Sequence, residues 1–455
     1  MIPKLPKNKF LVDGLYFIAS EDRVSVLVTY GKGRYNFSEI VIPKSVRYAG
    51  YDFCVTGIDK DAFSRNESLC HVVIPDTIIT IGSWAFMGCT SLTHVEVPSS
   101  VNYIRRGAFA ECHALSSIII PESVIDIDSS AFNLCSSLVS LNLAPENPNY
   151  DFDNGVLFNK SKTRLIQCLC TKRGKYIIPS SVESIDPWAF YGCSKITSLT
   201  IPYHLTNIGK CAFCGCTSLT SIVWNAKKIN ALPSSSDHPF YYIRHGIESF
   251  TFGEHVEEIP QNLCNDMHSL NKIIIPSNVN RIGTSAFERC YVTKENFINF
   301  SFLDSVVNNY WGVQFVDSDL NGLLIRNNTI VNIRKNISSI TIPADITDIF
   351  IQAFDDAPLF ESIRVDAMNS IYDSREDCNA IIETATNSML FIGSKNSFIP
   401  QTIRSVQNCA YTKVFKSQVR TIKYNGTMAD WDKIQALSVF CSRFTILCSD
   451  GSIRQ

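Results

Sequence analysis

The sequence predicts a repeat solenoid, mainly β with short helical or 3-10 turns, in which about 14 coils of 23 residues stack into a parallel sheet. Two markers share this period. A proline ends successive units at Pro75, Pro98 and Pro121. An Ala-Phe pair keeps the same interval within two runs, whose phenylalanines are Phe63, Phe86, Phe109, Phe132 and then Phe190, Phe213. Because one short unit cannot bury its own apolar side chains, this period indicates stacked coils that share a core.

Each unit alternates as a short strand requires. In one unit, Val95 and Val97 are expected to point into the core, and Glu96 between them points outward. Pro98 then ends the strand because proline has no N–H to continue a ladder. The remainder of the unit predicts an extended corner, followed by one turn of α- or 3-10 helix at the Ala-Phe pair.

The two ends of the chain break this pattern and are predicted to be caps. Residues 1–45 contain DGLYFIASEDRVSVLVTY, two apolar strands around a polar turn, which predicts a capping hairpin. The solenoid is predicted over residues 46–420. In residues 421–455, Met428, Trp431 and Ile434 lie three apart, so a short amphipathic helix and a last strand are expected to close this end.

Several intervals are longer than 23 residues, which indicates insertions on individual coils. They are predicted near residues 146–170, 226–249, 293–333 and 370–393. Three of them contain a similar apolar strand, polar turn and apolar strand, a β-hairpin that begins at Asn154, Asn321 or Asn379. The segment from Thr293 to Trp311 is the least regular and predicts a loop or a short helix.

Many of the 17 cysteines follow the repeat. Six fall three residues after a repeat phenylalanine: Cys89, Cys112, Cys135, Cys193, Cys216 and Cys290. A buried ladder of reduced thiols is predicted there, although stacked neighbours could come close enough to pair. Cys211 and Cys214 have the C-x-x-C spacing of a zinc or redox site, but they flank a core Ala-Phe pair, and zinc would need further ligands.

These features resemble the BspA-type leucine-rich repeat family, found on surfaces of host-associated bacteria and in some protozoan parasites. The resemblance covers nearly the whole chain: the L-x-x-I-x-I-P…A-F-x-x-C unit, the hairpin sequences and the closing YNGTMADW and CSDGSI segments. It implies a right-handed leucine-rich-repeat β-α superhelix. It also implies a cell-surface or extracellular location and, for some members, adhesion to host proteins.

Composition excludes several other classes. The 455 residues are 45% hydrophobic, and 41 basic against 43 acidic residues argue against a polybasic nucleic-acid binder. No run approaches the roughly 18 apolar residues of a membrane helix, so no transmembrane segment is expected. The basic first residues lack a following apolar stretch, so no signal peptide is predicted in this chain.

Catalytic and metal-binding sequence motifs are scarce. H-E-x-x-H, G-x-S-x-G and G-x-x-x-x-G-K-[ST] are absent, and the eight histidines are scattered, so no enzyme activity, cofactor or metal site is predicted. The alternative is a metal-dependent enzyme with its site in the irregular loops, 226–249 or 293–316. The residues that motivate it are Trp224, His238, Tyr241, Tyr242, His245 and Trp311.

The better functional candidate is the outward face of the strands, where one residue of each strand joins a column. The candidate binding residues in this column are Glu96, Asn142, Thr200, Thr251, Thr341 and Arg364. Hydroxyl and β-branched residues suit any wet strand, so a plain structural explanation of the column is strong by itself. Together with the resemblance, the column favours a non-enzymatic module that binds a protein or glycan, such as a host matrix or surface molecule. A rigid architectural scaffold is the alternative, and the oligomeric state stays open.

Overall fold

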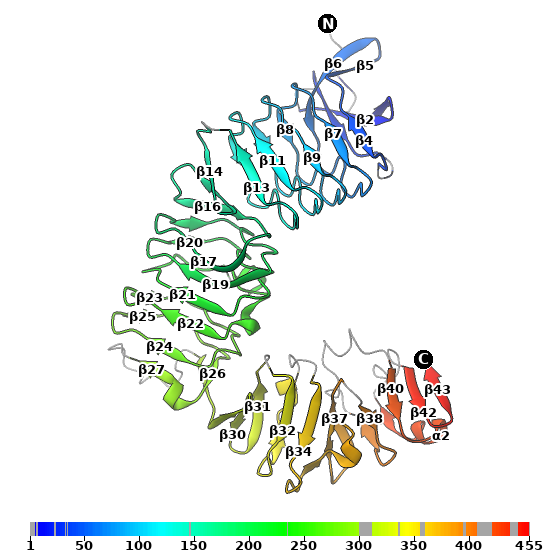
Figure 1. The fold of residues 1–455 in the computed structure, drawn as a ribbon, viewed down its shortest axis with the longest axis vertical. Helices are drawn as coiled ribbons and strands as arrows, with labels where there is room; N and C mark the ends of the chain where they lie inside the picture. The colour runs from blue at the N-terminus through cyan, green and yellow to red at the C-terminus, as the bar shows by residue number, and fades with distance from the viewer. Residues whose placement is uncertain are drawn as a thin grey trace. The chain divides into compact units, whose positions relative to one another are not determined.

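The computed structural model describes residues 5, 8–21, 24–31, 33, 35–144, 147–233, 235–299, 312–334, 337–354, 360–394, 397–406, 421–436 and 445–454. Over these residues the chain is a β-solenoid of about 15 turns, with mostly parallel strands and little helix, as predicted (Figure 1). Two compact units are distinguished, the first mainly residues up to Leu263 and the second mainly residues from Cys264 onward.

Parallel ladders in several separate stretches form what we call the strand face. In the first unit its strands are β4 (Glu39–Val41), β7 (His71–Val73), β9 (His94–Val95), β11 (Ser117–Ile120), β13 (Ser140–Leu143), β17 (Arg173–Ile177), β19 (Lys195–Ile201), β21 (Ser221–Trp224) and β22 (Ser249–Phe252). In the second unit they are β32 (Ser339–Ile342), β34 (Ser362–Val365), β38 (Phe398–Ile399), β40 (Thr421–Tyr424) and β42 (Thr445–Cys448). Further short strands are β24 (Ile273–Ile275), β26 (Tyr291–Val292), β27 (Phe297–Asn299) and β28 (Gln314–Phe315).

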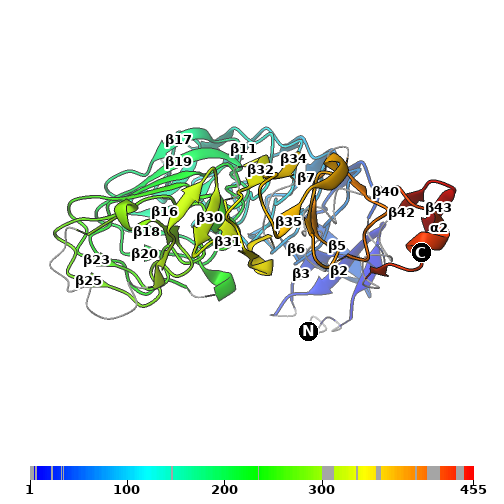
Figure 2. The ribbon, with the colours of Figure 1, turned by 90° about the horizontal axis from the view of Figure 1, so that it is seen from below.

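A second parallel ladder, interrupted in several places, forms where the sequence predicted only an extended corner, and in most coils it follows the proline. Its two-residue strands are β8 (Thr80–Ile81), β10 (Tyr103–Ile104), β12 (Asp126–Ile127), β18 (Ser184–Ile185), β20 (Asn207–Ile208), β23 (Glu258–Ile259), β25 (Arg281–Ile282), β33 (Asp348–Ile349), β39 (Ser405–Val406) and β41 (Gln435–Ala436). Figure 2 shows β18 and β20 apart from β17 and β19, on a different side of the same coils. Coils that contribute a strand to both ladders are therefore hydrogen-bonded to a neighbour along two sides.

The Ala-Phe segment closes each coil. Ring centroids of Phe86 and Phe109 lie 5.4 Å apart and those of Phe109 and Phe132 5.8 Å apart, with nearly parallel planes. The Phe109 N–H donates to the carbonyl of Ala131 in the next coil at 2.8 Å. Gly107, two residues before Phe109, has a φ of 62°, which an α-helix does not allow. Most coils therefore have hydrogen-bonded turns here, whereas η5 (Ile351–Phe354) is a 3-10 helix.

Antiparallel meanders interrupt the coils and confirm the predicted hairpins. They comprise β1 (Phe10–Val12), β2 (Leu15–Ala19) and β3 (Val26–Thr29); β14 (Tyr150–Asp153), β15 (Val156–Asn159) and β16 (Arg164–Cys168); β29 (Ser318–Leu320), β30 (Leu323–Arg326) and β31 (Thr329–Ile333); and β35 (Tyr372–Asp373), β36 (Ala380–Glu383) and β37 (Ser388–Ile392). The last strand of each meander joins the second ladder in parallel. β3 does so through β6 (Tyr51–Ile58), which also pairs with β5 (Ser45–Tyr48).

Two-residue turns connect the first two strands in three of these meanders. Asn154 and Gly155 have φ angles of 50° and 79°, and Asn321 and Gly322 have φ angles of 50° and 90°. Positive φ at both central residues is what a type I′ hairpin requires, and Asn-Gly is the sequence that tolerates it best. The turns place Asn154 and Asn321 beside the strand face.

The insert predicted at 226–249 contributes to the core as well as forming a loop. It contains η1 (Ser235–Asp237) and η2 (Arg244–Gly246), and Phe240 between them stacks on Phe213 with a 5.0 Å centroid distance. The Phe213 N–H donates to the Pro239 carbonyl, so Pro239-Phe240 takes the place of the usual Ala-Phe pair. The phenylalanine stack thus continues through a segment that the period alone did not identify.

The C-terminal end contains a short helix and a last strand, and Ile434, which was expected on the helix, lies after it. Helix α2 (Met428–Trp431) begins with a capping box: the Asp430 backbone N–H donates to the Thr427 hydroxyl, and the Thr427 backbone N–H donates to the Asp430 carboxylate. Trp431 is buried against Tyr424. Strand β43 (Gly451–Arg454) then pairs antiparallel with β42. Other short helices are η3 (Lys294–Asn296) and η6 (Arg375–Asp377), and within the described segments the helices are too short or too polar to serve as a bilayer span.

The cysteine ladder is confirmed as a column of buried free thiols. All fifteen cysteines in the described segments are unpaired. The Sγ atoms of Cys89, Cys112 and Cys135 donate to the carbonyl oxygen of the phenylalanine in the preceding coil, at 3.2, 3.2 and 3.0 Å. Burial raises the pKa of Cys89 and Cys135 to about 12, so these thiols stay protonated and unreactive at neutral pH.

We expect alkylation of the native protein at pH 8 to label exposed Cys54 and Cys70 and to spare Cys89, Cys112 and Cys135 until the chain unfolds. In the unfolded chain these thiols regain their ordinary pKa of 9.0, whereas in the folded chain they keep their protons above that pH. The free energy of unfolding therefore falls as the pH rises above 9.0. Peptide mapping by mass spectrometry after timed iodoacetamide exposure measures each site. Equal labelling rates for Cys112 and Cys70 in the native protein would contradict the buried ladder.

Candidate binding face

Outward side chains of the strand face align in columns within each stretch of paired strands. In the first unit, Glu96 bridges to Ile119, and Ile119 is in register with Asn142. Thr200 and Thr251 flank Val223 in a second stretch, over strands β19, β21 and β22. In the second unit Thr341 is in register with Arg364. Five of the six candidate residues are exposed, and Thr200 is half-buried.

Exposed aliphatic side chains lie in the same columns as the polar candidates. Val41 and Val73 are register partners and are 68% and 43% exposed, and Ile119 is 53% exposed. Ile177, the register partner of Thr200, is 71% exposed. Val41 and Ile177 were not among the predicted members of this column, which lacked β4 and β17. Alternation along each strand was the signal that could have found them.

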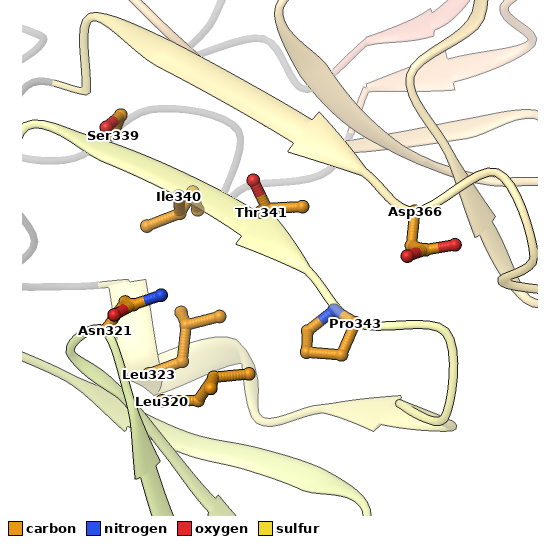
Figure 3. A pocket seen from close by; sticks show the side chains of 8 residues that line it. All are labelled: Leu320, Asn321, Leu323, Ser339, Ile340, Thr341, Pro343 and Asp366. Atoms are coloured by element: carbon orange, nitrogen blue, oxygen red, sulfur yellow. The ribbon is translucent and has the colours of Figure 1, made fainter.

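A hollow of about 390 Å³ lies beside candidate residue Thr341 in the second unit. Figure 3 shows Ser339, Ile340 and Thr341 along strand β32, with Asn321 and Leu323 on the facing hairpin. Leu320, Pro343 and Asp366 complete its lining. The hollow exists because the Asn321–Gly322 turn projects beside the strand face, which gives an otherwise flat sheet a concave site with apolar and polar walls.

The loop residues that motivated an enzyme have structural explanations where they are described. Trp224 and His238 are fully buried. Burial, and secondarily the charge of Arg244, lowers the pKa of His238 to about 3, so this imidazole is neutral. Tyr241 and Tyr242 are exposed and contact each other edge to face, and His245 is half-buried. Trp311 lies outside the described residues.

The C-x-x-C segment is built into the core. Cys211 Sγ donates to the Ser236 carbonyl at 3.2 Å, and burial raises the pKa of Cys211 to about 12. A protonated thiol is a poor nucleophile and a poor zinc ligand. Across the segments that the structure describes, no group of three or more His, Cys, Asp or Glu side chains is arranged to hold a metal ion.

The 23-residue coils, the parallel strand ladders and the stacked phenylalanines define a leucine-rich repeat solenoid. Residues 56–168 and 166–294 match the model of the BspA type leucine rich repeat region, in six copies. The chain belongs to this family.

Solved structures with similarity to the chain are bacterial leucine-rich repeat proteins. The pneumococcal vaccine antigen PcpA is 14% identical, with 97% of this chain and 99% of that chain covered and a TM-score of 0.42. A leucine rich cell surface protein from Faecalibacterium prausnitzii is 16% identical over 95% of this chain and 99% of its own, with a TM-score of 0.32. A leucine-rich repeat protein from Bacteroides capillosus is 30% identical over 30% of this chain and 98% of its own, with a TM-score of 0.27. No curated protein matches the chain.

Proposed function

We propose that the chain is a non-enzymatic binding module at the cell surface or outside the cell, whose strand face contacts a protein or glycan of a host. The observation that carries the proposal is the column of exposed aliphatic and polar side chains along the strand face, including Val73, Glu96, Ile119 and Asn142. Repeat proteins use such extended faces for partners, and exposed apolar side chains in a row favour contact with another molecule. In this proposal, residues 1–45 and 421–455 cap the ends of the solenoid formed by residues 46–420.

The candidate residues would make different kinds of contact with the partner. Glu96, whose side chain is 85% exposed, and Asn142 supply polar contacts around the aliphatic side chains. Thr200 and Thr251 supply hydroxyls in the second stretch. In the second unit, Thr341 supplies a hydroxyl at the hollow, and its register partner Arg364 supplies a guanidinium. The mixture of apolar and hydrogen-bonding groups is typical of the surfaces that bind proteins.

We expect the double substitution Thr200→Lys/Thr251→Lys to abolish saturable binding to a partner found by screening the purified chain against host matrix glycoproteins and a glycan array. Two ammonium groups on long side chains would hold a partner off the sheet and resist desolvation. Biolayer interferometry against the captured partner measures the loss.

The matched control is Thr217→Lys/Ser218→Lys, which adds the same charge to an exposed turn after Cys216. Retained binding in Thr200→Lys/Thr251→Lys, or equal loss in the control, would contradict a role for this part of the strand face. A panel without any binding partner would instead favour the architectural alternative.

A further inference from the structure

A second hollow, of about 600 Å³, lies on the strand face of the first unit where the Asn154–Gly155 turn meets it. Its cations come from two adjacent strands and the segment before them: Lys172, Arg173, Lys175 and Lys195. Its other walls are Ser136, Ser137, Val139 and Thr171. We call it the basic hollow. It corresponds in position to the hollow beside Thr341, because both form next to an Asn-Gly hairpin turn.

The basic hollow concentrates positive charge that the protein does not neutralise. Arg173 and Lys195 are register partners on the parallel strands β17 and β19, and like charges in that position repel. No carboxylate lines the hollow. Within the described residues, no ion pair involves Arg173, Lys175 or Lys195. Because the whole chain has a net charge of -2, this cluster is a local feature and not part of a generally basic surface.

The local backbone keeps these cations together on one face. The register between β17 and β19 shifts between Gly174 and Lys175, and Gly174 has a φ of 74°. Such a β-bulge redirects the side chains on either side of it, and both Arg173 and Lys175 are exposed. Lys172 is fixed at the rim, since its Nζ donates to the Asn154 carbonyl and lies 4.5 Å from the Tyr176 ring centroid.

We propose that the basic hollow binds the sulfate or carboxylate groups of an acidic polysaccharide. The guanidinium of Arg173 can bond an oxyanion in a bidentate manner, and the lysines add charge without fixed geometry. Ser136 and Ser137 offer hydroxyls to match those of sugar rings, the Thr171 hydroxyl, which donates to the Leu138 carbonyl, can accept, and Val139, 65% exposed, offers an apolar contact. The inference rests on the proposed binding function, because it assigns a ligand class to one part of the same face.

The test titrates the full chain with a size-defined sulfated glycosaminoglycan octasaccharide, its desulfated form, a hyaluronan octasaccharide and a polyglutamate peptide, by isothermal calorimetry at low and physiological salt. We expect saturable binding of the sulfated or carboxylated sugars that weakens with salt, and an affinity about tenfold or more lower in Arg173→Glu/Lys195→Glu. Lys210→Glu/Arg404→Glu, with the same change in net charge at two other exposed sites, should bind as the wild type does.

The single variant Arg173→Glu tests whether a loss of affinity comes from misfolding. It places opposite charges in register with Lys195, so its melting temperature should stay the same or rise while its affinity falls. Absence of acidic-sugar binding, equal loss in the control pair, or preferential binding of polyglutamate would overturn the inference. If acidic sugars do not bind while a screened partner still binds in a Thr200- and Thr251-dependent manner, this inference fails and the proposed function stands.

Discussion

Replacing Phe109 with alanine is expected to lower the free energy of unfolding by about 3–5 kcal/mol. Its ring is fully buried and stacks on both neighbours, with interplanar angles of 5° to Phe86 and 4° to Phe132. Removal therefore leaves a cavity that touches three coils at once. Because coils of a solenoid contact only their neighbours, the loss cannot be compensated from elsewhere in the core.

Guanidinium unfolding followed by circular dichroism measures the effect of Phe109→Ala. Phe37→Ala, which removes the same ring from a site that is 43% exposed, is the control and should cost well below half as much. Equal losses in the two variants would mean that the buried phenylalanine stack does not hold the coils together.

Replacing Arg334 with methionine is expected to destabilise the second unit by about 1.5–3 kcal/mol, because it removes a buried guanidinium and its hydrogen bonds. The guanidinium side chain is 8% exposed, and its Nε donates to Asp319 Oδ2 at 2.6 Å. It also donates to the carbonyls of His268 and Leu270 at 3.2 Å. Methionine would fill similar volume but leave the Asp319 carboxylate and both carbonyls without this donor.

Thermal unfolding of Arg334→Met measures this loss. Arg334→Lys should recover only part of it, since an ammonium cannot reproduce the guanidinium geometry. The control is Arg289→Met, whose side chain is 62% exposed and paired with Asp266; it should cost below about 1 kcal/mol. A cost for Arg334→Met as small as that of Arg289→Met would contradict the role assigned to the buried arginine.

The same arginine supports the hollow of the second unit. Asp319, which it binds, also accepts the Gly322 N–H through its other carboxylate oxygen at 3.1 Å. Arg334 therefore reaches the Asn321–Gly322 turn through a single carboxylate, although it lies outside the lining of the hollow shown in Figure 3. Arg334 would therefore affect a ligand in this hollow only by holding the turn in place.

Features repeated along the sequence were predictable from it. The interval between phenylalanines predicted stacked coils that share a core, and the cysteine three residues later predicted the thiol column, because every coil places the same residue at the same depth. The strand face was predictable for a related reason: alternation in a strand fixes which side chain is buried and which is exposed. Thus Glu96 and Thr341 are exposed as expected.

Other features depend on contacts that the sequence pattern does not encode. Strands of the second ladder, such as Tyr103–Ile104, are only two residues long, too short to show alternation. Phe240 escaped notice because Pro239 replaces the usual alanine and the interval from Phe213 is longer than 23 residues. The proximity of Lys175 to Lys172, Arg173 and Lys195 depends on the bulge and on the hairpin turn.

The bonds around each Ala-Phe turn limit how the length of such a protein can change. A phenylalanine N–H donates to the coil ahead, and the cysteine thiol three residues later donates to the coil behind. Duplication or loss of a whole unit would preserve both bonds at the new junction, so the chain can be lengthened or shortened in genetic steps of 23 residues. An insertion of any other length must instead project from the coil as a loop or hairpin. The hairpins are insertions of this kind, and the hollows of the strand face lie next to them.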